Sequence, residues 1–184
     1  MNNFTVQKPP FEGLLLIRTK VLGDARGFFM ETFNRKSFEE LGLDVEFVQC
    51  NRSRSIRGTL RGLHFQKTRP QGKLVSVTQG EVFDVAVDLR ADSPTFGRWQ
   101  GVNLKGDDGL LFYIPPGFAH GFCVVSDTAD FSYMCTDFYA PEDEGGLIWN
   151  DPAIGIEWPV AGDALLISPK DEHLPHLKDC FVYR

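Results

Sequence analysis

The segment Arg61–Gln66 (RGLHFQ) contains a residue that could move protons, His64. In a strand, His64 would share a face with Gly62 and Gln66, whereas Arg61 would alternate with them. A histidine in a strand near several arginines could act as a general base at neutral pH. A structural histidine with satisfied hydrogen bonds fits the same pattern, and the segment taken alone favours that interpretation.

Two tyrosines and an aspartate add further acid and base groups. Tyr133 and Tyr139 are six residues apart, so in an extended segment they would point to the same side. A tyrosine can act as a general acid, although most tyrosines belong to a core or its rim. Asp171 could fix the tautomer of a histidine, as the aspartate of a serine-protease triad does. Spacing alone does not pair Asp171 with His64.

A third feature raises the question of a bound metal. The loop of residues 115–122 (PPGFAHGF) contains His120, and a similar loop supplies a ligand in metal-binding cupins. The metal signature of those proteins also needs a His-x-His pair followed by a glutamate, and here Gln66 stands two residues after His64. Two histidines without an obvious carboxylate make a poor iron or zinc site. We therefore expect no metal.

Charge is unevenly distributed along the chain. The 184 residues carry a formal net charge of −6, which argues against nucleic-acid binding. No Asp or Glu occurs between Phe47 and Gly80, whereas this stretch contains seven basic residues. They are Arg52, Arg54, Arg57, Arg61, Lys67, Arg69 and Lys73. Guanidinium groups bind phosphate through two parallel hydrogen bonds, so the cluster could attract a small anionic ligand. A solvated face explains it equally well.

Short strand-like segments separated by turns predict one all-β domain, a sandwich or barrel, over residues 1–184. Besides the segment that contains His64, strands are expected at residues 13–22, 28–33, 45–50, 74–78, 82–89, 99–104, 110–114, 122–125 and 131–136. The strands at 74–78 and 82–89 are expected to form a hairpin. Ser37–Glu40 has the pattern of a capping box and predicts the start of a short helix that Gly42 ends.

Cysteine spacing and the length of apolar runs bear on the cellular location of the protein. The four cysteines form no C-x-x-C pair and predict reduced thiols: Cys50, Cys123, Cys135 and Cys180. No apolar run approaches the roughly 18 residues of a membrane span. The first ten residues contain no apolar signal core. We expect a cytoplasmic protein without a membrane partner.

Several motifs together resemble one family, the dTDP-4-dehydrorhamnose 3,5-epimerases. In chain order they are residues 24–31 (DARGFFME), 49–53 (QxNxS), 57–66 (RGxxRGLHFQ), 71–73 (QGK), 80–88 (GExxDVxVD), 115–122, 139–144 (YxPxxE) and 168–171 (SPKD). Each motif alone is weak evidence, but their order and spacing cover nearly the whole chain. The resemblance implies a cupin jelly-roll fold and a homodimer in which N-terminal segments cross to the partner's sheet. It also implies a dTDP-linked 4-keto-6-deoxyhexose substrate and no metal or organic cofactor.

The resemblance also implies catalytic roles. His64 would be the general base that removes protons from the carbons on either side of the C4 ketone. Asp171 would hold its imidazole in the working tautomer. Lys73 would stabilise the enolate charge, and Tyr133 would return a proton to the opposite face. Inversion requires two catalytic groups on opposite sides of the carbon, because a single base tends to restore the original face.

Substrate contacts follow from the same motifs. Arg26 and Arg61 are expected to bind the diphosphate. The remaining expected contacts are Glu31, Gln49 and Asn51 with nucleotide and sugar, Phe29 and Tyr139 as stacking partners for thymine, His120 at the sugar, and Lys170. Three alternatives stay open: an epimerase acting at C3 or C5 only, a metal-dependent cupin oxygenase, and a sugar-binding jelly roll without activity.

Overall fold

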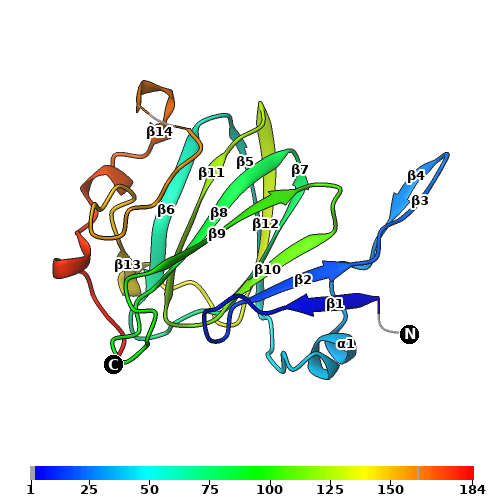
Figure 1. Ribbon diagram of the computed structural model, residues 1–184, viewed down its shortest axis with the longest axis horizontal. Coiled ribbons are helices and arrows are strands. Elements are labelled where there is room, and N and C mark those ends of the chain that lie inside the picture. The colour runs from blue at the N-terminus through cyan, green and yellow to red at the C-terminus, as the bar shows by residue number, and fades with distance from the viewer. Residues whose placement is uncertain (1–2, 161) are drawn as a thin grey trace.

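Two β-sheets face each other in the computed structural model, which describes residues 3–160 and 162–184 (Figure 1). The first sheet has the order β1 (Phe4–Gln7), β2 (Leu15–Thr19), β10 (Leu110–Ile114), β7 (Lys73–Gln79), β12 (Thr128–Cys135) and β5 (Gln49–Ile56). The second has the order β13 (Glu144–Gly146), β6 (Thr59–Gln66), β11 (Phe118–Val124), β8 (Glu81–Asp88) and β9 (Trp99–Lys105), with β14 (Leu166–Ile167) parallel to β6. The predicted all-β jelly-roll sandwich is confirmed.

The chain repeatedly crosses from one sheet to the other, and one predicted hairpin is therefore wrong. Strand β7 pairs with β10 and β12, whereas β8 pairs with β9 and β11. The turn between β7 and β8 contains Gly80, whose φ is +79°. A Cβ at this position would lie 2.1 Å from the carbonyl oxygen of Thr128. The close approach admits only glycine, and the chain there changes sheets instead of folding back beside itself.

The main core lies between the sheets, and it is aromatic. Phe112 and Phe131 are fully buried in it, and Phe122 stacks on Phe131 with ring centroids 4.1 Å apart. Burying one large apolar side chain stabilises a fold by roughly 1.5–3 kcal/mol. The rings of Phe122 and Phe131 also line a polar cavity.

Further layers cover the outer faces of both sheets. Helix α1 (Arg35–Glu40) covers the first sheet, where Phe38 lies 5.0 Å from Phe4 between ring centroids. The side chain of Asn34 caps this helix by accepting the N–H of Ser37, so the predicted capping box at Ser37 is wrong. The second sheet is covered by the C-terminal segment, which contains the 3-10 turns Pro141–Asp143, Gly162–Ala164, Asp171–His173 and Leu177–Asp179.

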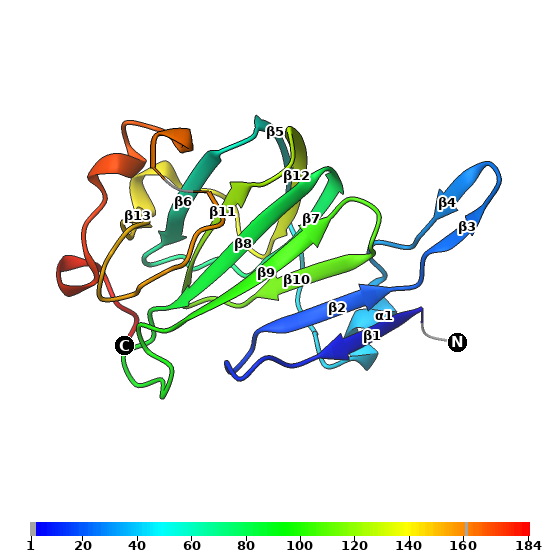
Figure 2. The same cartoon turned by 45° about the horizontal axis from the view of Figure 1, so that its top comes forward.

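A hairpin of β3 (Leu22–Asp24) and β4 (Gly27–Phe29) projects away from the body (Figures 1 and 2). Three strand predictions are corrected here: the strand expected at 13–22 is interrupted after Thr19, that at 28–33 ends at Phe29, and that at 45–50 begins at Gln49. In the hairpin, β3 and β4 pair only with each other among the described strands. Phe29 is consequently 66% exposed although it is apolar.

The structure also bears on membrane-spanning helices and on the cysteines. In the described part of the chain, no helix has the length and apolar character needed to cross a membrane. All four cysteines are free thiols, as predicted.

Candidate active site

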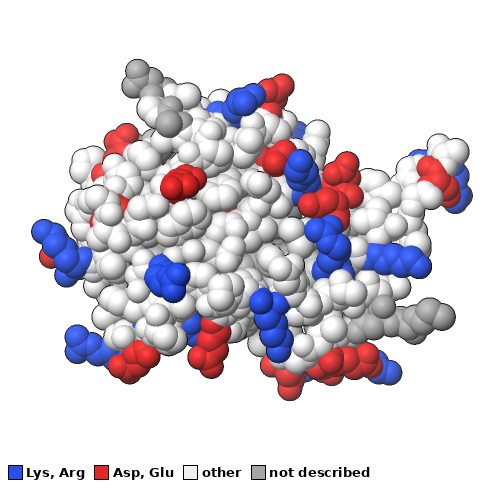
Figure 3. All heavy atoms as spheres, in the orientation of Figure 1, with Lys and Arg blue, Asp and Glu red and all other residues white. Residues whose placement is uncertain are grey.

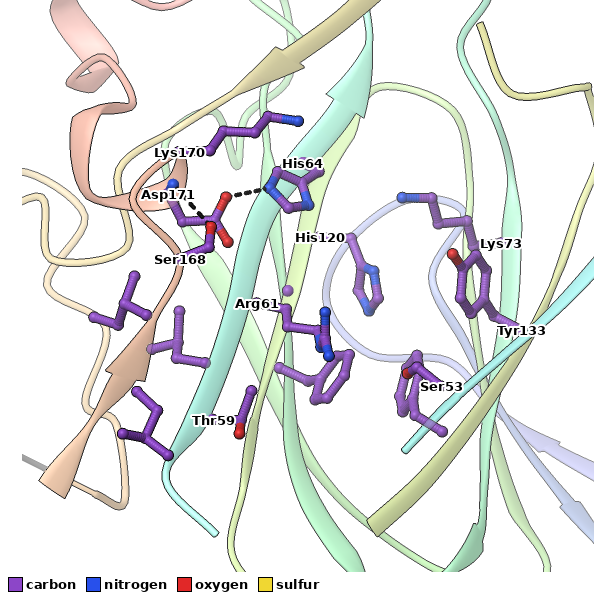
Figure 4. Close-up of a pocket in the computed structure, with 16 residues that line it drawn as sticks. Ser53, Thr59, Arg61, His64, Lys73, His120, Tyr133, Ser168, Lys170 and Asp171 are labelled. Atoms are coloured by element: carbon purple, nitrogen blue, oxygen red, sulfur yellow. Dashed lines mark hydrogen bonds and ion pairs between the residues drawn. The ribbon is translucent and has the colours of Figure 1, made fainter. Parts of the chain in front are cut away.

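A cavity of about 500 Å³ receives polar side chains from both sheets (Figure 4). His64 on β6 and His120 on β11 come from the second sheet. Lys73 on β7 and Tyr133 on β12 come from the first. The jelly-roll crossings thus bring together residues that are widely separated in sequence.

A bulge in β6 turns Arg61 into the same cavity as His64. His64 lies opposite His120, but Arg61 lies opposite Phe122, so β6 has one residue more than β11 between these pairs. Strict alternation predicts that Arg61 and His64 face opposite ways, and that prediction is wrong. A Cβ on Gly62 would lie 2.7 Å from the carbonyl oxygen of His120, so the bulge needs glycine.

His64 and Asp171 form a hydrogen-bonded pair at the edge of the cavity. The Nε2 atom of His64 lies 2.6 Å from Oδ1 of Asp171, which is 3% exposed. Asp171 Oδ2 also accepts the backbone N–H of Gly62. Burial raises the pKa of Asp171, but the hydrogen bonds from His64, Gly62 and Ser168 outweigh it, and the pKa lies below its usual value. The ionised Asp171 therefore fixes the proton of His64 on Nε2.

Burial shifts the pKa values of Lys73 and Tyr133 in opposite directions. Removal from water lowers the pKa of Lys73, and nearby Cys135, Asp84 and Glu144 only partly offset this. Removal from water also raises the pKa of Tyr133, so its hydroxyl keeps its proton at neutral pH. Tyr133 is thus an acid, whereas burial makes the charged form of Lys73 less favourable than on an exposed lysine.

His120 forms a second imidazole–carboxylate pair, with Asp84 on β8. Its Nε2 atom lies 2.9 Å and 3.1 Å from the two carboxylate oxygens. Asp84 is fully buried, and burial lowers the pKa of His120 despite this carboxylate. Asp84 belongs to the sequence motif at residues 80–88, but it is not among the predicted site residues. The available signal was a charged residue between the apolar residues 82–83 and 85–87 of the strand interior.

A second cavity of about 210 Å³ adjoins the first and shares His64, Lys73 and Tyr133 with it. Further polar side chains line this smaller cavity, among them Gln49, Asn51, Gln66, Gln71, Tyr139 and Glu144. Three of them are predicted substrate contacts. Glu144 is an addition, although it belongs to the motif at residues 139–144. Lys170, another predicted contact, lines the larger cavity.

The structure does not bring Arg26, Phe29 and Glu31 to these cavities within one chain. Arg26 is on the projecting hairpin, where it binds Asp24 at 2.6 Å. Its side chain is 90% exposed. Glu31 accepts a hydrogen bond from Asn34. Their predicted roles remain predictions.

A family model described as dTDP-4-dehydrorhamnose 3,5-epimerase matches residues 8–179. The chain belongs to this family. The dTDP-4-dehydrorhamnose 3,5-epimerase of Methanothermobacter thermautotrophicus is 51% identical to it over 100% of both chains. A dTDP-4-dehydrorhamnose 3-epimerase of Streptomyces niveus is 39% identical, with 88% of this chain and 78% of the relative covered.

A solved structure extends the likeness to three dimensions. It is that of dTDP-6-deoxy-D-glucose-3,5-epimerase from Legionella pneumophila in complex with dTDP-4-keto-L-rhamnose. Its TM-score is 0.94 at 49% identity, with 98% of each chain covered. The membership makes the chain an enzyme of the isomerase class, as the resemblance implied.

The basic stretch seen in the sequence divides between this site and surface ion pairs. Arg52 and Arg54 both bind Asp130, and Arg69 binds Asp137 at 2.7 Å. Lys73 and Arg61 line the cavity. On the face shown in Figure 3, basic and acidic side chains are mixed around an uncharged centre. Only part of the cluster is therefore available to an anionic ligand in the epimerase site.

A metal site needs several His, Cys, Asp or Glu side chains that converge on one point. Within residues 3–160 and 162–184, no group of three His, Cys, Asp or Glu side chains is arranged to hold a metal ion. His64 and His120 each bond a different carboxylate instead.

Proposed function

We propose that the chain converts dTDP-4-dehydro-6-deoxyglucose to dTDP-4-dehydrorhamnose by inverting C3 and C5, without a metal or organic cofactor. One observation carries the proposal: His64 and Tyr133 reach the same cavity from opposite sheets (Figure 4). A sugar ring between them would present one face to a base and the other to an acid. This arrangement is what inversion of a carbon centre needs.

The chemistry begins with a carbon acid beside the C4 ketone. Because Nε2 of His64 is bound to Asp171, Nδ1 is the nitrogen that accepts the C5 proton. The electron pair of the C–H bond moves onto the C4 oxygen and forms an enolate. The protonated amine of Lys73 stabilises this oxyanion, because charge interactions are strong in a desolvated cavity. Tyr133 then donates its hydroxyl proton to the opposite face of C5.

A second round at C3 uses the same groups. His64 returns its proton to solvent, and the Tyr133 phenolate regains one, so neither residue is consumed. The ring must then be presented with C3 between the base and the acid. Both carbons are activated by the same C4 ketone, so one Lys73 serves both steps.

The two cavities also offer residues that would bind the nucleoside, the diphosphate and the sugar of the substrate. The smaller cavity, with Gln49, Asn51 and Tyr139, is suited to the nucleoside, since amides pair with the base edge and a phenol ring stacks on its face. Arg61 would bind the diphosphate through its guanidinium. Lys170 adds a second cation at the larger cavity. His120 would contact the sugar.

The functional unit would be a cytoplasmic homodimer. The projecting hairpin exposes the apolar side chains of Leu22, Phe28 and Phe29, which a second copy would cover. In such a dimer, Arg26 and Phe29 would complete the partner's diphosphate and thymine sites, and Glu31 would approach the nucleotide. Four free thiols agree with a reducing compartment.

An epimerase acting at one carbon is the second candidate, because the Streptomyces niveus relative is named a 3-epimerase. The two candidate functions are distinguished by incubating the protein with dTDP-4-dehydro-6-deoxyglucose in deuterated water with a chelator present. Nuclear magnetic resonance then follows C3 and C5. Deuterium at both carbons, with inversion, supports the 3,5-epimerase. Deuterium at one carbon identifies a single-carbon epimerase, and none at either contradicts both.

A further inference from the structure

Glu144 joins two segments that meet at the rim of the site. It is the first residue of β13, which pairs with β6 so that Gly146 lies opposite His64. The Glu144 side chain is 17% exposed. Its Oε2 atom accepts the hydroxyl of Tyr139 at 2.8 Å and lies 2.6 Å from Nζ of Lys170. One carboxylate oxygen therefore holds both side chains.

The two segments serve different cavities. Tyr139 lines the smaller cavity, and its backbone N–H donates to Oε1 of Gln49. Lys170 lines the larger cavity and directly precedes Asp171 at the start of a 3-10 turn. Glu144 thus connects the predicted stacking ring to the turn that carries the histidine's carboxylate partner.

The charge of Glu144 strengthens both bonds. Burial raises its pKa, but hydrogen bonds from Lys170 and Tyr139 outweigh this, and the pKa lies below its usual value. The carboxylate is therefore ionised near neutral pH. Hydrogen bonds to an ionised acceptor are shorter and about twice as strong as neutral ones.

We propose that Glu144 is a positioning residue that couples occupancy of the smaller cavity to the geometry of the His64–Asp171 pair. The inference rests on the proposed function, in which the nucleoside occupies the smaller cavity. A thymine base stacked on Tyr139 would fix the position of the phenol ring. The hydroxyl of Tyr139 would then keep Glu144 in place, and Glu144 would keep Lys170 in place beside Asp171. Binding energy from the nucleotide is then used at the reacting carbon, far from where it arises.

The test uses Glu144→Gln, which keeps the size of the side chain and removes its charge. Two quantities are measured: the Kd for dTDP, and the rate of deuterium exchange at C5 with saturating substrate. We expect a weaker Kd and a slower exchange, each by about fivefold or more. Lys170→Met should slow exchange similarly. The double variant should be no slower than the slower single variant, because both changes break one ion pair.

Glu142→Gln is the matched control, since Glu142 is an exposed residue of the neighbouring 3-10 turn. It should leave both quantities unchanged. If Glu144→Gln does not fold, Tyr139→Phe, which keeps the stacking ring and removes only the hydroxyl, must slow the saturated exchange.

Exchange by the wild-type chain is the benchmark for the proposed function. If the wild type exchanges and Glu144→Gln alters only one quantity or neither, the coupling is wrong and the proposed function stands. A wild-type chain without exchange overturns both.

Discussion

Oδ1 of Asp171 lies 2.6 Å from Nε2 of His64, across 107 positions of sequence. The bond commits Nε2 as a donor and leaves Nδ1 as the basic nitrogen. Asp171 follows Lys170 in a C-terminal 3-10 turn, whereas His64 lies on a central strand. The tautomer and orientation of the His64 ring therefore depend on how the C-terminal segment docks on the second sheet.

Replacing this carboxylate tests the pair. Asp171→Asn should lower kcat by roughly 10²–10⁴-fold, because the amide no longer fixes the working tautomer. The KM should change little, because Asp171 is bound to His64 and Gly62. Steady-state kinetics measure both constants. Glu172→Gln, at an exposed position of the same turn, should be neutral. A kcat within twofold of wild type would exclude the pair from the mechanism.

The same variant has a consequence for stability against pH. The pKa of Asp171 is depressed in the folded chain, so its stabilising contribution is present above the unfolded value near 3.9 and is lost as pH falls through the folded value. The Tm difference between wild type and Asp171→Asn should therefore shrink on acidification from neutral pH. Thermal unfolding followed by circular dichroism at several pH values measures it. A constant difference would contradict the linkage.

The lowered pKa of Lys73 predicts that the reaction rate falls at alkaline pH, which gives the rate profile an alkaline limb. Burial lowers the pKa of this amine, so it loses its proton as pH rises, before an exposed lysine would. The rate should fall there, because a neutral amine stabilises the enolate poorly. Lys73→Arg should move this limb to higher pH, since a guanidinium stays charged. Lys73→Met should lower kcat by roughly 10²–10³-fold at every pH. An unchanged limb in Lys73→Arg would assign it to another group.

Sequence patterns located most strands and several of the residues that line the cavities, because alternation and motif spacing are local signals. They failed where a contact made by distant residues decides the outcome. The turn at Gly80 looks like a hairpin locally, but its packing on Thr128 sends β8 to the other sheet. The bulge in β6 similarly depends on close approach to β11, and it reverses the expected direction of Arg61.

Residue spacing along the chain also could not predict the two histidine–aspartate pairs, whose members are far apart in sequence. His64 with Asp171 came only from family resemblance, and His120 with Asp84 was not foreseen. Both depend on the order of strands in the folded sheet. A carboxylate flanked on both sides by apolar strand residues, as at Asp84, remains a usable local signal, since burying an unpaired charge is costly.

Tyr133→Phe separates exchange from inversion. The variant keeps the base but lacks the hydroxyl that protonates the opposite face, so C5 should still acquire deuterium while inversion falls by roughly 10²–10⁴-fold. Nuclear magnetic resonance of the product distinguishes the two events. Tyr113→Phe removes a buried hydroxyl outside both cavities and should retain full inversion. Inversion at the wild-type rate by Tyr133→Phe would show that another acid acts.

The hairpin of β3 and β4 is expected to complete the active site of a partner subunit. Arg26→Ala and His64→Ala should each be almost inactive, because one lacks the diphosphate contact and the other lacks the base. If the hairpin of one subunit completes the partner's cavity, a mixed dimer holds one site with both residues intact. Unfolding and refolding an equal mixture should therefore restore about a quarter of wild-type activity, since half the dimers are mixed and each has one good site of two. No recovery, with mixed dimers shown by mass spectrometry, would mean that Arg26 serves its own chain.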